Sequence, residues 1–206
     1  EISCSLVGSE MCIRDRLLDV LDKYNVKATF FVTNTRPDYR TMIAEEAKRG
    51  HTVAIHSASH VYSQIYQSED AYFADLEEMN QIIIEQTGQG AQIIRFPGGS
   101  SNTVSAKYSR GIMSRLVKDV EARGFLYCDW NVSSGDAGSR PISTQQVVQN
   151  VTEGMQKNNV SIVLQHDIKE FSVNAVEQII QWGLAEGYTF LPLSTSSPMS
   201  HHGVNN

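Results

Sequence analysis

Hydrophobic residues follow two alternating patterns along the chain from Leu17 onward. Short apolar runs rich in β-branched residues are typical of buried strands, whereas apolar residues repeated every three or four positions are typical of amphipathic helices. The first pattern predicts six strands, within residues 26–33, 50–60, 91–96, 125–132, 161–166 and 188–193. The second pattern predicts six helices, at residues 17–24, 41–49, 69–86, 109–123, 144–157 and 173–186.

Residues at the helix ends support these boundaries. Ser68 is a good N-cap for the helix at 69–86, because its hydroxyl can accept a backbone hydrogen bond from the first turn. Gly50, Gly124 and Gly187 follow three of the helices, where a left-handed backbone conformation commonly ends a helix. The regular alternation of strands and helices predicts an α/β fold with parallel strands, either a closed (β/α) barrel or an open doubly wound sheet.

The composition fits a single globular domain. The chain has 206 residues, of which 41% are hydrophobic and 19% charged, so a substantial core can form. The 17 Lys and Arg are outnumbered by 23 Asp and Glu, which gives a net charge of -6 and makes nucleic acid a poor candidate partner. The sequence has no run of 18 apolar residues and therefore predicts no transmembrane segment.

Both ends of the chain depart from the regular pattern. Residues 1–16 show neither helical nor strand periodicity and resemble translated adaptor sequence at the ends of proteins from short-read assemblies. We interpret them as a non-native or disordered segment, with a frayed natural terminus as the alternative. Residues 194–206 are rich in Ser and lack periodicity, which predicts a flexible tail with solvated His201 and His202. The predicted domain therefore comprises residues 17–193.

Two histidines stand four positions apart after the strand in the 50–60 stretch. Neutral imidazole is a common ligand of zinc, and His56 and His60 at one strand end can converge on one ion. Two surface or hydrogen-bonded histidines are the alternative for such a pair. The helical H-E-x-x-H motif of zinc proteases is excluded, because Ser57 stands where that motif has its Glu.

Further polar residues stand near the ends of later predicted strands. Arg95 and His166 end two of these strands, and Asp129 and Asp136 accompany a third. In α/β folds the loops after parallel strands converge at one edge of the sheet, where ligands bind. We therefore expect these side chains to share one site with the two histidines.

Two of these segments suit the hydrolysis of an acyl group. Arg95 is a permanent cation beside the backbone of Gly98 and Gly99, whose N–H groups can stabilise an oxyanion. His166 can act as a general acid, and Asp136 can hold its ring. Purely structural roles are the alternatives: an arginine paired with a carboxylate, and a hydrogen-bonded histidine at the rim.

Five segments, taken together and in order, carry a family resemblance. They read KATFFVT, GHTVAIHSASH, IIRFPGGSSN, YCDWNVSSGDA and VLQH. The series resembles the NodB-homology domain of polysaccharide deacetylases, the fourth carbohydrate esterase family, and the match extends over residues 17–193. The resemblance implies a distorted (β/α) barrel that hydrolyses N-acetyl or O-acetyl groups of a polysaccharide with the help of a metal ion.

The resemblance also implies roles for individual residues. His56 and His60 match the metal ligands of the family, and zinc is the expected divalent metal. Arg95 matches the arginine that pairs with the catalytic base. The Gly98 N–H corresponds to the donor that stabilises the oxyanion.

The general acid of the family corresponds to His166, and Asp136 matches the carboxylate that orients it. Leu164 matches the residue that lines the pocket for the acetyl methyl group. Many members have Trp after the orienting Asp, where this chain has Ala137. Trp130 is therefore the candidate to supply aromatic surface.

One family motif has no counterpart in the residues given. Members carry TFDDGP on their first strand, where one Asp is the general base and the other the third metal ligand. That strand is expected just before Leu17, but Glu10 and Asp15 stand there, neither paired nor on a predicted strand. With two histidines alone, metal affinity falls and the bound water lacks its base. We therefore predict a deacetylase fold that lacks its first strand and is inactive as given.

The resemblance leads to two classes of function. The first is a deacetylase that removes N-acetyl groups from cell-wall glycan such as peptidoglycan, with chitin oligosaccharide or acetylxylan as alternative substrates. The second is a non-catalytic, carbohydrate-binding relative that keeps the groove and has lost the base. Because these polymers lie outside the membrane, the resemblance implies an extracellular or cell-surface protein.

Overall fold

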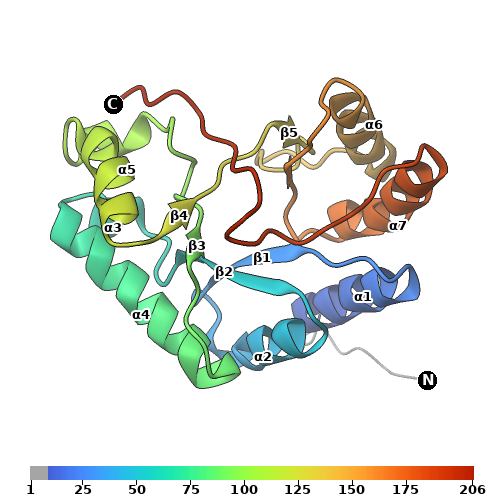
Figure 1. The fold of residues 1–206 in the computed structure, drawn as a ribbon, viewed down its shortest axis with the longest axis horizontal. Coiled ribbons are helices and arrows are strands. Elements are labelled where there is room, and N and C mark those ends of the chain that lie inside the picture. Colours follow the sequence, from blue (N-terminus) through green and yellow to red (C-terminus); the bar gives the residue numbers. More distant parts are fainter. Residues whose placement is uncertain (1–8) are drawn as a thin grey trace. The chain divides into compact units, whose positions relative to one another are not determined.

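The computed structural model describes the backbone of residues 9–206 and the side chains of residues 13–206. Within this part the chain divides into two compact units (Figure 1). The first unit comprises the described residues up to Ala28 together with Trp130–Leu191, and the second comprises Thr29–Asp129 together with Pro192–Asn206. Each unit contains its own parallel sheet and is described by itself.

A four-stranded parallel sheet forms the centre of the second unit. Its strands are β1 (Thr29–Thr33), β2 (Thr52–Ser57), β3 (Ile93–Ile94) and β4 (Leu126–Tyr127), and their order in the sheet follows the chain. Ile55 of β2 pairs with Ile94 of β3, and both side chains are fully buried. Because the strands are parallel, the loops that follow them lie along one edge of this sheet.

Helices connect the strands of the second unit. They are α2 (Thr41–Lys48), α3 (Tyr62–Ile65), α4 (Glu69–Thr87) and α5 (Ile112–Ala122), and short 3-10 helices lie at Pro37–Tyr39 and Val104–Lys107. Helices α2 and α4 pack against each other and against β2, and α5 packs against β4 (Figure 1). This packing follows the predicted alternation of strand and helix.

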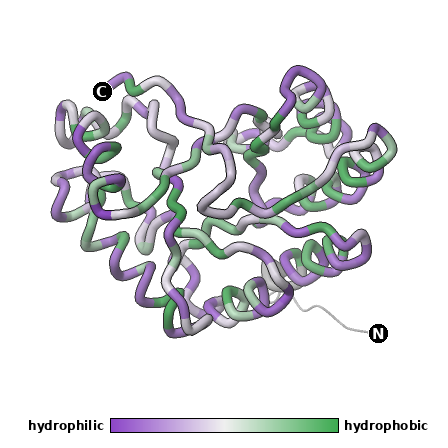
Figure 2. Tube along the Cα trace, viewed as in Figure 1, coloured by the Kyte–Doolittle hydropathy of each residue, from purple (hydrophilic) through white to green (hydrophobic). Residues whose placement is uncertain are grey.

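Helix α4 has the amphipathic stripe and the N-cap predicted from the sequence. The Ser68 hydroxyl accepts a hydrogen bond from the Ala71 N–H at 3.1 Å, and Gly88, with φ 79°, ends the helix. Figure 2 shows hydrophobic and hydrophilic positions alternating along this helix. The buried residues are Tyr72, Phe73, Leu76, Met79, Ile82 and Ile83.

The first unit combines three helices with a two-stranded parallel sheet. Its elements are α1 (Ser9–Lys23), β5 (Val132–Ser133), α6 (Thr144–Met155), β6 (Val163–Leu164) and α7 (Glu170–Ala185). Helices α6 and α7 form a core cluster that includes Val147, Val151, Ala175 and Ile179. Helix α1 packs against α7, where Lys23 and the Tyr24 hydroxyl both donate hydrogen bonds to Glu177.

All six predicted helices are present, and the largest difference concerns α1, which begins at Ser9 instead of Leu17. Residues 9–16 of the segment interpreted as non-native or disordered are therefore helical, and residues 1–8 lie outside the described residues. The Arg14 guanidinium pairs with Asp167 at 2.8 Å, a partner so distant in sequence that no local periodicity indicates it. No helix in residues 9–206 is long and apolar enough to span a membrane.

The predicted strands are shorter in the structure, and two predictions were wrong. The run at 125–132 divides into β4, which pairs with β3, and β5, which pairs with β6. Residues 188–193 form no strand. Pro192 has no N–H to donate, and the backbone N–H and carbonyl of Leu193 bond to the hydroxyls of Thr29 and Thr52 instead of to a neighbouring strand.

The C-terminal segment, residues 194–206, contacts other parts of the second unit and is not the solvated tail predicted from the sequence. The His201 ring stacks on Tyr127 with centroids 3.9 Å apart, and the His202 N–H donates to Asp129 at 2.9 Å. The Asn206 carbonyl accepts a hydrogen bond from the Ser114 N–H of α5 at 3.2 Å. The segment lacks periodicity because its backbone bonds to loop and helix residues rather than within a regular element.

Replacing the N-cap of α4 is expected to destabilise the protein. In Ser68→Ala the Ala71 N–H loses its acceptor, so the free energy of unfolding should fall by about 1 kcal/mol. Urea unfolding followed by circular dichroism measures this difference. Ser63→Ala, at an exposed position of α3, is the control and should change stability little. Equal stability of the two variants would contradict the capping role.

Candidate functional site

The two candidate metal ligands lie side by side at the end of β2 in the second unit. Their ring centroids are 5.0 Å apart, and the rings are inclined by 41°. His56 belongs to β2, whereas His60 adopts a left-handed backbone conformation, with φ 55°. The structure therefore brings the predicted pair together, and the turn between them is what returns His60 towards His56.

A backbone hydrogen bond fixes the tautomer of His56. Its Nδ1 lies 2.8 Å from the carbonyl oxygen of Arg95. Since a carbonyl oxygen can only accept, Nδ1 carries the proton in this hydrogen bond. In the neutral ring the lone pair is then on Nε2, the nitrogen suited to a metal ion, and a hydrogen bond from the other ring nitrogen to a carbonyl is typical of metal-bound histidines.

Arg95 is buried, with 7% of its surface exposed, and is held by backbone oxygens. Its Nε donates to the Cys128 carbonyl at 2.8 Å and its terminal nitrogen to the Asp129 carbonyl at 2.9 Å. The guanidinium also lies over the Phe31 ring at 4.0 Å. Burial lowers the pKa of Arg95, and contacts with Cys128 partly offset this effect. The predicted pairing of Arg95 with a catalytic base stays a prediction.

Gly98 is exposed at a turn where a side chain does not fit. Its φ is 80°, and a Cβ at this position would lie 2.7 Å from the Tyr62 hydroxyl. Burial raises the pKa of Tyr62, so this hydroxyl stays protonated at neutral pH. Only glycine combines this conformation with so close a neighbour. The predicted role of its N–H as an oxyanion donor is compatible with this exposed position and stays a prediction.

The predicted histidine and aspartate pair is present in the first unit. Asp136 accepts a hydrogen bond from His166 Nδ1 at 2.7 Å and another from the His166 backbone N–H at 2.8 Å. The Ser172 hydroxyl donates to the same carboxylate at 2.6 Å. The His166 side chain is 36% exposed, whereas Asp136 is buried. Asp136 therefore holds the ring of a partly accessible imidazole, and the predicted catalytic roles of the two residues stay predictions.

The hydrogen bonds to Asp136 change its protonation. Burial by itself raises the pKa of this carboxyl, but hydrogen bonds from His166 and Ser172 outweigh burial and lower it to about 2. The side chain is consequently ionised at every pH at which the protein is expected to work. Because an ionised carboxylate only accepts, Nδ1 of His166 carries the proton in the hydrogen bond between them.

The two remaining predicted site residues also belong to the first unit. Leu164 lies in β6, two positions before His166, and is partly buried. Trp130 precedes β5 and is partly buried as well. Their predicted contacts with substrate stay predictions. His56, His60, Arg95 and Gly98 belong to the second unit, so the predicted site residues form two groups, each described within its own unit.

The described residues fit only part of a metal site. Among the side chains of residues 13–206, His56 and His60 do not gather with a third His, Cys, Asp or Glu in a metal-binding group. Two imidazoles, of which His56 has a fixed tautomer, suit a divalent transition metal such as zinc, but a hydrolytic zinc site has three protein ligands. The donor set thus agrees with the resemblance, in which the third ligand comes from the first strand.

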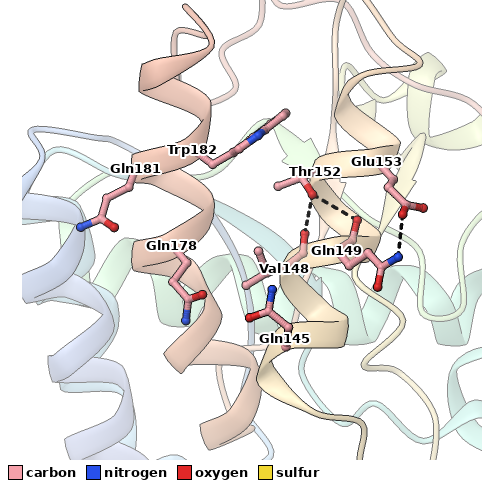
Figure 3. Close-up of a pocket in the computed structure, with 8 residues that line it drawn as sticks. All are labelled: Gln145, Val148, Gln149, Thr152, Glu153, Gln178, Gln181 and Trp182. Atoms are coloured by element: carbon pink, nitrogen blue, oxygen red, sulfur yellow. Dashed lines mark hydrogen bonds between the residues drawn. The ribbon is translucent and has the colours of Figure 1, made fainter.

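An open groove between α6 and α7 contains none of the predicted site residues. Figure 3 shows Trp182 and Gln178 of α7 opposite residues of α6, with Gln149 donating to Glu153. Its lining consists of Gln145, Val148, Gln149, Thr152, Glu153, Gln178, Gln181 and Trp182. The only hydroxyl in this lining is that of Thr152, which donates to the Val148 carbonyl of its own helix. The lining residues therefore do not form a pair that could catalyse hydrolysis.

Sequence reasoning missed Ser172 and Asp75, which hold the loops that contain the histidines. Ser172 is 36 positions from Asp136, and Asp75 is 18 positions from the Ser57 hydroxyl that it binds. Both residues stand on helices, where the sequence alone does not distinguish them from polar residues of the exposed face. The signal that could have found Asp75 is its place between apolar positions of α4, on a partly buried face.

The ionised state of Asp136 is expected to make stability depend on pH in the acid range. Its pKa is about 2 in the folded protein and 3.8 as the ordinary value, so the stabilisation is complete above pH 4 and is lost as the pH falls through 2. The loss amounts to about 2 kcal/mol. Urea unfolding between pH 5 and pH 2 should show a shallower decline for Asp136→Asn than for the unmodified chain. The exposed Asp70→Asn serves as control, and parallel curves for all three proteins would refute the role of Asp136.

Comparison with known families and proteins agrees with this geometry. The family model described as polysaccharide deacetylase matches residues 8–114, more than half of the chain. A peptidoglycan-N-acetylglucosamine deacetylase of Bacillus cereus is 28% identical over 179 residues, which cover 84% of this chain and 62% of that protein. The chain therefore spans less than two thirds of the length of this relative.

Solved structures give the same result. The catalytic domain of peptidoglycan N-acetylglucosamine deacetylase from Eubacterium rectale is 79% identical, with a TM-score of 0.93, over 93% of this chain and 87% of that one. A polysaccharide deacetylase from Bacillus cereus is 25% identical, with a TM-score of 0.75, over 94% of this chain and 90% of that one. These neighbours confirm the predicted fold class, α/β with parallel strands of the NodB type, and agree with a distorted (β/α) barrel that lacks a strand. The chain belongs to the polysaccharide deacetylase family.

Proposed function

We propose that this protein is a metal-dependent hydrolase of carbon–nitrogen bonds other than peptide bonds, which removes N-acetyl groups from cell-wall glycan such as peptidoglycan. Family membership and the 79% identical catalytic domain of a peptidoglycan N-acetylglucosamine deacetylase support this substrate class. The single observation that carries the proposal is the pair formed by His56 and His60 at the end of β2. Two adjacent imidazoles, one of them on a residue with an unfavourable left-handed backbone, favour a ligand-binding role over a purely structural one.

The pair would hold a divalent metal, for which zinc is the best candidate. His56 offers Nε2, because its Nδ1 donates to the Arg95 carbonyl. When bound, zinc lowers the pKa of a coordinated water towards ~7 and polarises a carbonyl oxygen. All other roles fall to side chains and backbone groups of the chain itself.

We assign these roles by chemistry. The Gly98 N–H is exposed and can donate to the oxyanion that develops on the acetyl oxygen. Protonated His166 can donate its proton to the amine that leaves, and Asp136 keeps its ring oriented through Nδ1. Arg95 can hold a catalytic carboxylate, since it is permanently charged.

Contacts with the sugar complete the proposal. Leu164, two positions before the general acid, can line an apolar pocket for the acetyl methyl group. Trp130 can supply an aromatic surface for a sugar ring. Because the substrate is a polymer outside the membrane, we place the protein in the extracellular space or on the cell surface.

The residues given lack one part of this chemistry. Residues 1–28 contain no adjacent Asp pair, so neither the general base nor the third metal ligand of the family motif is present in them. We therefore propose that the chain as given does not deacetylate. The same observation favours a second candidate, a non-catalytic relative that binds carbohydrate, with chitin oligosaccharide and acetylxylan as other possible ligands or substrates.

Acetate release from N-acetylated peptidoglycan in the presence of zinc tests the proposal. The chain as given should release none, whereas a chain in which a strand bearing TFDDGP replaces residues 1–16 should be active. In that active background His166→Ala should lower the rate by about 10²–10⁴-fold, the usual contribution of a general acid. His56→Ala should abolish activity through loss of metal.

Two results would oppose the proposal. Acetate release by the chain as given, lost in His166→Ala, would refute its inactivity. A repaired chain that binds peptidoglycan fragments without releasing acetate would favour the carbohydrate-binding alternative. Chitin oligosaccharide and acetylxylan, assayed in parallel, would identify a different substrate if either reacted faster than peptidoglycan.

A further inference from the structure

One carboxylate of α4 accepts three hydrogen bonds from the loop between the two histidines. Asp75 Oδ2 accepts from the Ser57 hydroxyl at 2.6 Å and from the Ala58 N–H at 2.9 Å. Asp75 Oδ1 accepts from the Ser59 N–H at 2.8 Å. Three consecutive loop residues are thus bound to a single side chain of a helix that packs against β2.

The same network continues to His60. The Ser57 oxygen, which donates to Asp75, also accepts a hydrogen bond from the His60 N–H at 2.8 Å. His60 is one of two non-glycine residues with positive φ among those described, the other being Asn25. A left-handed conformation is unfavourable for a residue with a side chain and persists only where the surroundings enforce it. The bonds from Asp75 through Ser57 provide that enforcement.

The number and type of donors explain why an aspartate stands here. An ionised carboxylate only accepts, so each of the three donors finds an oxygen. An asparagine would turn an NH2 group towards an N–H or a hydroxyl and would lose at least one of these bonds. The three donors to Asp75 belong to the loop residues between the histidines, so its influence on the two imidazoles passes through that loop.

We propose that Asp75 is a positioning residue that sets the spacing and orientation of His56 and His60 for one metal ion. The inference rests on the metal site of the proposed function and adds a residue that none of the five sequence motifs contains. Asp75 acts by preorganisation: with the loop already fixed, metal binding does not have to order His60. Loss of this preorganisation should lower the affinity for the metal ion by a larger factor than a general loss of stability would.

A zinc titration by isothermal calorimetry tests the inference on the full chain. His56→Ala defines the part of the binding that depends on the histidine pair, because His201 and His202 can also bind metal. Asp75→Asn should weaken the His56-dependent binding by about 10–100-fold, the effect expected for an outer-shell partner of a metal ligand. Glu78→Gln, at an exposed position of the same helix, is the matched control and should bind zinc like the unmodified chain.

A second control separates positioning from general stability. Val120→Ala opens a cavity in the core of α5, within the same unit, and lowers the thermal midpoint without touching the histidine loop. Zinc affinity should be unchanged in Val120→Ala and reduced in Asp75→Asn. Equal loss of affinity in both variants would overturn the inference, since affinity would then follow stability alone.

A double-mutant cycle with Ser57→Ala tests the route through Ser57. If Asp75 acts through the Ser57 hydroxyl, the double variant Asp75→Asn/Ser57→Ala should bind zinc no more than about twofold more weakly than the weaker single variant. If the double variant lost zinc affinity by the product of the two single losses, Asp75 would not act through the Ser57 hydroxyl.

The outcomes also distinguish the inference from the proposed function. Unchanged affinity in Asp75→Asn, with His56-dependent binding in the unmodified chain, overturns the inference and leaves the metal site intact. If the unmodified chain binds no zinc through His56, both the inference and the proposed metal site of this chain fail.

Discussion

Carboxylates that accept several hydrogen bonds hold the loops on which the candidate site depends. Four of the six strands contain only two residues, so the sheet ladders by themselves fix little of the chain beyond them. A buried or partly buried carboxylate needs partners for its oxygens, because its desolvation is costly. Where the donors are backbone N–H groups of a loop, the hydrogen bonds that the carboxylate accepts also fix the conformation of that loop.

Three aspartates show this constraint, each within one unit. Asp75 binds the loop between His56 and His60. Asp136 binds both the backbone and the ring of His166. Asp129 accepts from the Ser100 N–H and hydroxyl and from the His202 N–H, which joins the loop after β3 to the C-terminal segment. The geometry of the candidate site is therefore set by polar contacts as much as by the apolar core.

The proposed function gives the two histidine sites different chemistry, and their hydrogen-bond partners differ accordingly. His56 donates through Nδ1 to a neutral carbonyl, which leaves Nε2 as a lone pair for a metal ion. His166 donates through Nδ1 to an ionised carboxylate, which holds its ring in one orientation. The same residue type can thus serve the two proposed roles, because its hydrogen-bond partner differs in charge. Family membership supplies the reaction class, and these partners explain how single residues can serve it.

The sequence by itself determined the elements whose signal is local. Apolar periodicity indicated six of the seven α-helices in the described residues, Ser68 indicated the start of α4, and ordered motifs identified the family. These signals are local because helix spacing, caps and strand-end residues depend on neighbours a few positions away.

Only the tertiary structure decided the features that depend on distant partners. Helix α1 begins earlier than predicted, and Arg14 in its added part pairs with Asp167. The run at 125–132 divides between two sheets. Residues 194–206 bond to α5 and to Asp129. Asp75 and Ser172 likewise serve the histidine loops from helices that stand elsewhere in the sequence. Hydrogen bonds and ion pairs between residues far apart leave no periodic trace in the sequence, because each needs only one suitable side chain at one position.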